Sequence, residues 1–382
     1  MKVPAEFDEI RPYSPEELPA VFNELLADEQ FMQVALSMLG GMPKEQFKAA
    51  LLSCQTNLEV QKMFFYPLLK QLLAKCSAGC DMNADALADK NQQYTFISNH
   101  RDIVLDSALL SVMLVDNYFP TTVEIAIGDN LLIYPWIKKL VRINKSFIVQ
   151  RSLSMREMLA SSMRMSKYMH FAVREKGENI WIAQREGRAK DSNDRTQESV
   201  LKMMAMGGEG TPVERLSALN IVPLAISYEF DPCDYLKAKE FQQKRDNPEF
   251  KKSKQDDLQN MQTGIFGYKG RIHYHAAPCI NAWLPELADM PKTEFFTEVA
   301  RRIDQDIHRS YQMYPCNYIA ADWLEGTSTH QDKYTEEDKV AFEKYLSERV
   351  AMVDLENKDE AFLRESMLKM YANPLFNQLA AQ

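Results

Sequence analysis

Apolar positions recur at helical spacing along the first part of the chain. Between residues 14 and about 85, large apolar side chains return every three to four positions, and no β-branched alternation interrupts them. Ser14 and Pro15, followed by two glutamates, have the order of a helix N-terminus, and the glycines and proline of residues 40–43 break the run. The pattern predicts an N-terminal helical region over residues 1–88.

At Tyr94 the pattern changes to short β-rich segments separated by helical stretches. The segments expected to form strands are residues 94–98, 123–128, 147–150, 180–184, 221–230 and 271–278. Strands that alternate with helices indicate a mostly parallel sheet flanked by helices, and active sites of such sheets gather beyond the C-terminal ends of the strands. The sequence therefore predicts an α/β domain over residues 89–312.

The remaining segments are dominated by charge or by helical periodicity. Residues 231–262 are strongly charged and are expected to form an exposed excursion, whereas residues 313–382 are expected to form a C-terminal helical extension. The chain has no run of about 18 apolar residues, and its acidic, proline-punctuated start is unlike a signal peptide. We therefore expect a cytoplasmic protein whose contact with a membrane, at the inner face, is peripheral.

Composition and charge narrow the classes of function. The 382 residues are 46% hydrophobic and 26% charged, which is typical of a globular protein with a sizeable core. With 45 basic and 54 acidic side chains the net charge is -9, which argues against a general nucleic-acid partner, because phosphate neutralisation needs a basic face. The six cysteines are scattered and predict neither a disulfide framework nor a metal site.

A histidine and two aspartates follow the first predicted strand. His100 leaves residues 94–98, and Asp102 and Asp106 lie at the start of the next helix. A carboxylate in this position holds the imidazole tautomer and stabilises the imidazolium, so that the histidine can take a proton from a hydroxyl. The structural alternative is a solvated His100 with Asp102 as a helix cap.

Basic side chains follow two other predicted strands. Arg151 directly follows the segment 147–150. At the end of a strand, its guanidinium can donate two hydrogen bonds to a phosphate or carboxylate. Beyond residues 180–184, a glutamate and a flexible glycine precede Arg188 and Lys190, a combination that suits an anionic headgroup. Ordinary salt bridges and a charged surface loop are the alternatives. The sequence contains no P-loop, dinucleotide-binding fingerprint or nucleophile elbow.

Taken in order, these segments resemble the glycerolipid acyltransferase family, which includes glycerol-3-phosphate and lysophosphatidic acid acyltransferases. The four blocks are NHRDIVLDSALL (99–110), similar to the family's N-H-x4-D; SFIVQR (146–151); IAQREGRAK (182–190), similar to F-P-E-G-T-R; and NIVPLAIS (220–227). Their order and spacing match over about residues 90–312. One residue more than in the family separates His100 from Asp106, and Arg185 stands where the family has proline.

The resemblance implies a glycerol-3-phosphate acyltransferase-like α/β fold and an O-acyltransferase. His100 would be the general base and Asp106 its orienting partner, with Asp102 as the alternative partner. The residues implied in acceptor binding are Arg151, Glu186, Gly187, Arg188 and Lys190. The reaction would move a fatty acyl group from acyl-CoA or acyl-carrier protein to a hydroxyl of a glycerol phosphate, lysophospholipid or related lyso-lipid, with no other cofactor and no metal.

Three other functions stay open at this level. The first is O-acylation of a lyso-lipid that contains an amino acid, in which the basic third block reads a carboxylate. The second is hydrolysis of a thioester by water that His100 activates. The third is a catalytically silent protein that binds a lipid or an acyl carrier on the same scaffold.

Overall fold

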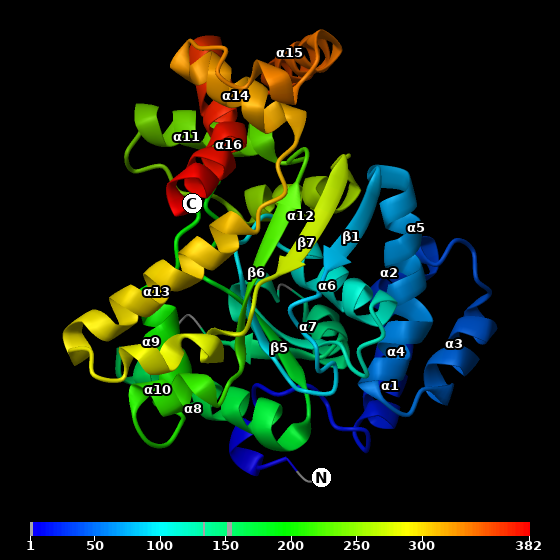
Figure 1. Ribbon diagram of the computed structural model, residues 1–382. Coiled ribbons are helices and arrows are strands. Elements are labelled where there is room, and N and C mark those ends of the chain that lie inside the picture. The colour runs from blue at the N-terminus through cyan, green and yellow to red at the C-terminus, as the bar shows by residue number, and fades with distance from the viewer. Residues whose placement is uncertain (1–2, 133, 151–154) are drawn as a thin grey trace.

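A single sheet forms the centre of the structure, a computed structural model that describes residues 3–132, 134–150 and 155–382. Its strands are β1 (Gly79–Asn83), β2 (Thr95–Ser98), β3 (Val123–Gly128), β4 (Ser146–Val149), β5 (Asn179–Ala183), β6 (Ile221–Tyr228) and β7 (Arg271–Ala276). They lie in the order β1-β7-β6-β2-β5-β3-β4, and Figure 1 labels β1, β7, β6 and β5. Neighbouring strands are parallel except β6 and β7. The predicted mostly parallel sheet is confirmed, and the C-terminal ends of β2 to β6 share one edge.

Strand β1 departs from the prediction, because residues 79–83 lie in the region predicted to be helical. The segment has no β-branched residue, so its local preference for a strand is weak. It is a strand because it pairs in parallel with β7, far along the chain, from Gly79 to Asn83. Cys80 and Met82 pack against the apolar core on one face of the sheet. A pairing this distant leaves no local pattern in the sequence.

Helices cover both faces of the sheet, as expected for alternating strands and helices. One face carries α5 (Tyr66–Cys76) and α6 (Leu105–Asp116), and the other carries α8 (Met155–Phe171), α9 (Glu198–Met206), α10 (Pro212–Ser217) and α13 (Lys292–Arg309). The sheet is therefore buried on both sides.

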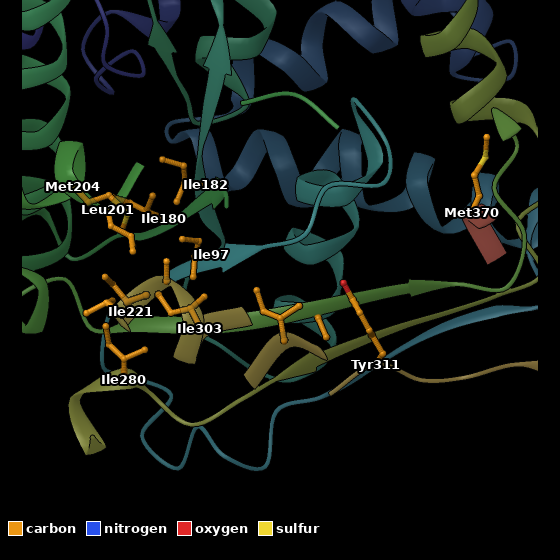
Figure 2. Close-up of a cluster of buried hydrophobic side chains, with 14 of the residues drawn as sticks. Ile97, Ile180, Ile182, Leu201, Met204, Ile221, Ile280, Ile303, Tyr311 and Met370 are labelled. Carbon is orange, nitrogen blue, oxygen red and sulfur yellow. The ribbon is translucent and has the colours of Figure 1, made fainter. Parts of the chain in front are cut away.

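Successive residues of a strand contribute to opposite cores. In β5, Ile180 and Ile182 pack with the second group of helices, whereas Trp181 between them packs with α6. Figure 2 shows Ile97, Ile180, Ile182 and Ile221 gathered against Leu201, Met204 and Ile303 of the helices. The period of two along each strand thus builds one core on each face.

Helices near the N-terminus share a third apolar cluster. These are α1 (Leu18–Ala27), α2 (Glu29–Met38), α3 (Lys44–Ser53) and α4 (Asn57–Val60), which pack with α7 (Pro135–Ile143). The carbonyl of Ile10 accepts a hydrogen bond from the backbone N–H of Ile148 at 2.9 Å, so the first residues cover the edge strand β4. No helix in the described parts of the chain is both long enough and apolar enough to cross a membrane.

The charged segment 231–262 is only in part the exposed excursion that the sequence predicts. Residues 244–259 are exposed or half-buried, whereas residues 231–242 are mostly buried. The segment forms α11 (Asp234–Asp246) and most of α12 (Lys254–Phe266). Asp234, Lys237 and Glu240 of α11 are buried. Each of them pairs with a side chain of opposite charge, which offsets part of the cost of burying it. Such pairing is a tertiary property, so hydropathy alone predicts exposure here.

The C-terminal helices lie beside α11 at the top of Figure 1. They are α14 (Pro315–Glu325), α15 (Glu336–Ala351) and α16 (Glu360–Ala381). The buried carboxylate of Asp234 accepts hydrogen bonds from Tyr345 Oη (2.7 Å), Arg349 Nε (2.5 Å) and Tyr371 Oη (2.8 Å). Burial raises the pKa of Asp234, and the Arg349 guanidinium opposes that rise. This carboxylate fixes α15 and α16 to the start of α11.

Short segments complete the described elements. They are the 3₁₀ or π turns Ala5–Phe7, Gln61–Phe65, Asp129–Leu131, Ala172–Lys176, Ile280–Ala282, Leu284–Leu287 and Gln331–Lys333.

Asp304 of α13 makes the stability of the fold depend on pH. Its Oδ1 accepts hydrogen bonds from Thr196 N and Oγ1, both at 2.7 Å, but burial outweighs them and raises the pKa of Asp304 to about 6. Because this pKa is higher in the folded chain, the stability it contributes is present at low pH and is lost as pH rises from about 4 to about 6. Asp304→Asn should match the wild type near pH 4 and be more stable near pH 7, by roughly 2–3 kcal/mol.

Urea unfolding at both pH values measures this difference. Asp289→Asn, at an exposed position ahead of the same helix, is the control. An Asp304→Asn variant that is less stable than the wild type at pH 7 would show that the hydrogen bonds of the ionised carboxylate outweigh its burial.

Candidate active site

His100 and Asp106 meet at the C-terminal edge of the sheet. Strand β2 ends at Ser98 and α6 begins at Leu105, so the loop between them carries His100 and the first turn of the helix carries Asp106. His100 Nδ1 lies 2.8 Å from Asp106 Oδ2. The side chain of Asp106 is 1% exposed and that of His100 is 14% exposed. The longer turn therefore still brings Asp106 back to the imidazole.

Three further donors hold the carboxylate of Asp106. The backbone N–H groups of Arg101 (2.7 Å) and Asp102 (3.0 Å) donate to the same Oδ2, and Tyr228 Oη donates to Oδ1 at 3.3 Å. A carboxylate that accepts all these bonds makes His100 Nδ1 a donor, which leaves Nε2 with a free lone pair. The arrangement gives His100 the tautomer of a general base.

Asp102, the alternative partner of His100, caps the helix instead. Its Oδ1 accepts hydrogen bonds from the backbone N–H groups of Val104 (2.8 Å) and Leu105 (2.7 Å). Burial, and then the charge of Asp106, raise the pKa of Asp102. Its Oδ2 lies 2.0 Å from the position that a Cβ would take at Gly264 of α12. A Cβ at that position would force the Asp102 carboxylate or α12 to shift, so glycine permits this close approach.

Two neighbours shape the loop around His100: Trp181, which the sequence analysis does not single out, and Asn99, the first residue of the first block. The ring of Trp181 meets the imidazole edge to face, with centroids 5.6 Å apart, and its Nε1 donates to Ser98 Oγ at 3.0 Å. The side-chain amide of Asn99 donates to and accepts from the backbone of Ile226, each at 2.8 Å. Asn99 thus ties the loop to β6. The alternation of β5, which puts Trp181 on the face of α6, is the sequence signal that could have found it.

The side chain of Arg101 anchors the loop in a buried network of charges. Its Nη1 contacts Asp194 Oδ2 at 3.3 Å, and its Nη2 contacts Ser192 Oγ at 2.5 Å and Asp231 Oδ2 at 3.5 Å. Lys237 also pairs with Asp231. Burial alone would raise the pKa of Asp231, but Lys237 and Arg101 outweigh it and lower the pKa to about 2. The residue next to His100 is therefore held by groups from two distant segments, residues 192–194 and 231–237.

The third block leaves β5 as a tight loop. Glu186 and Gly187 are exposed, and Gly187 has φ +68°, a backbone conformation that favours glycine. Arg188 Nη2 donates to Asn260 Oδ1 of α12 at 3.4 Å, whereas its buried Nη1 has no hydrogen-bond partner among the described residues. Because an unpaired buried N–H is costly, this guanidinium is suited to donate a hydrogen bond to a ligand oxygen.

Lys190 and Arg151 complete the predicted set. The ammonium of Lys190 turns toward Glu240 of α11 and pairs with it, so part of its charge is already matched within the protein. Arg151 lies outside the described residues, and β4, which precedes it, ends at Val149. Across the described ranges, no three His, Cys, Asp or Glu side chains come together in a way that could hold a metal ion.

The comparison with protein families agrees with the motifs. Residues 82–227 match the family model described as Acyltransferase, a segment that holds all four blocks, and this confirms the resemblance there. The crystal structure of the 1-acyl-sn-glycerophosphate (LPA) acyltransferase PlsC from Thermotoga maritima is similar over 75% of this chain and 93% of its own, with 11% sequence identity and a TM-score of 0.37. Among curated protein sequences, none matches this chain.

Proposed function

Residues 82–227 belong to the acyltransferase family, and on this premise we propose that the enzyme esterifies a glycerolipid precursor. The acyl group would come from a thioester, acyl-CoA or acyl-carrier protein. The acceptor would be a hydroxyl of a glycerol phosphate, lysophospholipid or related lyso-lipid. The observation that carries the proposal is the His100–Asp106 pair, 2.8 Å apart, at the edge of the sheet where the third block also begins.

In the proposed reaction His100 acts as the general base. Its Nε2 takes the proton of the acceptor hydroxyl as the oxygen attacks the thioester carbonyl. The tetrahedral intermediate then expels the thiolate, which takes the proton back from the imidazolium, so that an ester and a free thiol leave. Asp106 fixes the ring and stabilises its charged form. The reaction uses the acyl donor as a substrate and needs neither a covalent acyl-enzyme nor a bound cofactor.

Arg188 is the described residue best suited to hold the acceptor's anionic group. Its free Nη1 is buried, and a phosphate or carboxylate oxygen would satisfy it. Glu186 and Gly187 would shape the loop around that group, with Arg151 as the second predicted guanidinium. Lys190 adds positive charge nearby but is already paired with Glu240. For acceptors that reside in a membrane, we propose peripheral contact at its inner face.

Thiol release tests this function. Palmitoyl-CoA and palmitoyl-acyl-carrier protein serve as donors, with glycerol 3-phosphate, lysophospholipids and an amino-acid-containing lyso-lipid as acceptors. Release that depends on an acceptor, together with an esterified product, supports acyl transfer and names the acceptor. Release without an acceptor would instead identify a thioesterase. A folded protein that binds lysolipid and releases no thiol would be a silent binder.

Tyr228→Phe tests how firmly Asp106 must be held. The substitution removes the hydroxyl that donates to Asp106 Oδ1, and a lost hydrogen bond to a charged group predicts a fall in kcat of about 5–50-fold. The KM of the acceptor should stay unchanged, because the proposed role of Tyr228 is to hold Asp106 and not to contact the acceptor. Tyr118→Phe, at a residue that is 86% exposed, is the matched control. A higher KM with an unchanged kcat would place Tyr228 in substrate binding instead.

A further inference from the structure

Three lysines converge on one buried carboxylate beside the third block. Lys190 and Lys244 contact Glu240 Oε1, the latter at 2.8 Å, and Lys252 contacts Oε2 at 3.4 Å. We refer to Lys190, Lys244 and Lys252 as the Glu240 lysine cluster. The side chain of Glu240 is 4% exposed, whereas that of Lys244 is 50% exposed. The carboxylate is thus buried beneath ammonium groups that reach solvent.

Positive charge exceeds negative charge in this cluster. Lys252 has a second partner, Asp257, at 3.2 Å, so two carboxylates face three ammonium groups. Residues 239–257 together with Lys190 hold seven basic and five acidic side chains, although the whole chain has a net charge of -9. Burial lowers the pKa of Lys190, Glu240 opposes this, and Lys244 and Lys252 lower it again. These ammonium groups therefore repel one another, and an incoming anion would relieve that repulsion.

The cluster is continuous with the candidate active site. Lys190 lies two residues beyond Arg188, which donates to Asn260 of α12. One turn farther along α12, Gly264 touches Asp102 in the loop that carries His100. Lys244 belongs to α11 and Lys252 precedes α12, so both lie outside residues 82–227. Helix α12 therefore contacts both Arg188, in the loop that carries Lys190, and Asp102, in the loop that carries His100.

We propose that the Glu240 lysine cluster binds the phosphate of the acyl donor's phosphopantetheine arm, an inference that rests on the proposed function. In a phosphorylated acceptor, the phosphate is only a few bonds from the reacting hydroxyl and must bind close to His100, as Arg188 would allow. In the donor, a flexible arm with two amide groups separates the thioester from the phosphate. Lysines bind phosphate as point charges and suit such a mobile group. Coenzyme A and acyl-carrier protein both present this phosphate.

Substitution of two lysines tests the proposal against donors with and without phosphate. The double variant Lys244→Gln/Lys252→Gln keeps Lys190 and is compared with Lys344→Gln, a control at an exposed lysine of α15. The donors are palmitoyl-CoA, palmitoyl-acyl-carrier protein and the N-acetylcysteamine thioester of the same fatty acid, which has no phosphate. We expect the KM for a phosphate-bearing donor to rise about tenfold, equivalent to about 1.4 kcal/mol. The acceptor's KM and kcat/KM with the N-acetylcysteamine thioester should stay unchanged.

The pattern across donors identifies the source of the phosphate. A higher KM for palmitoyl-CoA alone assigns the cluster to coenzyme A. A higher KM for palmitoyl-acyl-carrier protein alone assigns it to the carrier protein. An equal loss with all three donors, including the one without phosphate, would overturn the proposal. Thermal melting of each variant shows whether the fold is kept. If the double variant unfolds, the same assays use the single variant Lys244→Gln, which changes the most exposed of the three lysines.

Binding without turnover separates this proposal from the proposed function. Calorimetric titrations compare coenzyme A and 4′-phosphopantetheine with unphosphorylated pantetheine, in the wild type and the double variant. Weaker binding of both phosphorylated ligands in the variant supports the cluster even if no acceptor is ever esterified. Acyl transfer in a double variant that binds these ligands as tightly as the wild type would leave the function standing and overturn the assignment.

Discussion

His100→Ala should lower kcat for acceptor-dependent thiol release by about 10²–10⁴-fold, the range for removal of a general base. The reason is that Nε2 of His100, left free because Nδ1 faces Asp106, is the group proposed to take the hydroxyl proton. Without it, proton loss to water must accompany attack on the thioester. The KM values of donor and acceptor should change little, since their binding groups stay in place.

A second histidine–aspartate pair provides the control for this result. His273 Nδ1 contacts Asp81, but the Asp81 side chain is 79% exposed and both residues lie on strands at the far end of the sheet from β4. His273→Ala should keep full activity, which shows that loss of an imidazole from the sheet is not itself damaging. Wild-type rates in a folded His100→Ala variant would remove His100 from the chemistry.

The contact between His100 and Asp106 could be predicted from sequence because the information is local. Strand β2, the turn and α6 are consecutive, and the residue types after a strand end suggest the chemistry. Because one extra residue separates His100 from Asp106, the sequence leaves open whether His100 pairs with Asp106 or with Asp102. Two backbone N–H groups on Asp106 Oδ2 decide it, and hydrogen bonds of this kind depend on the backbone path of the turn rather than on residue type.

Residues that arrive from distant parts of the chain could not be predicted in this way. Tyr228 reaches Asp106 from β6, and α11 buries charged residues because their partners come from elsewhere in the fold. Lys190 and Arg188 both carry a positive charge in the third block, and the sequence does not distinguish their roles. Only tertiary contacts separate them, because Glu240 pairs with Lys190 whereas Arg188 keeps a buried Nη1 without a partner among the described residues.

Asp106→Asn and Asp106→Ala should separate the charge of this residue from its geometry. An asparagine can place its oxygen at the Oδ2 position, where His100 Nδ1 and two backbone N–H groups donate, and its amide N–H₂ toward Tyr228 Oη. The ring orientation is then kept, and only the negative charge that stabilises the imidazolium is lost. We expect kcat to fall about 10–10²-fold with Asp106→Asn.

Alanine at this position should cost more, because it also removes the acceptor that orients His100 and leaves two backbone donors of the loop unpaired. We expect kcat to fall about 10²–10⁴-fold and the free energy of unfolding to fall by about 1–3 kcal/mol for each donor left buried without a partner. Steady-state kinetics and urea unfolding measure the two effects separately. Asp116→Asn, at the other end of α6 beside Tyr66 and Lys70, should leave kcat unchanged. Equal activity of Asp106→Asn and the wild type would show that the charge takes no part, and His100 would then need only a neutral acceptor to hold its ring.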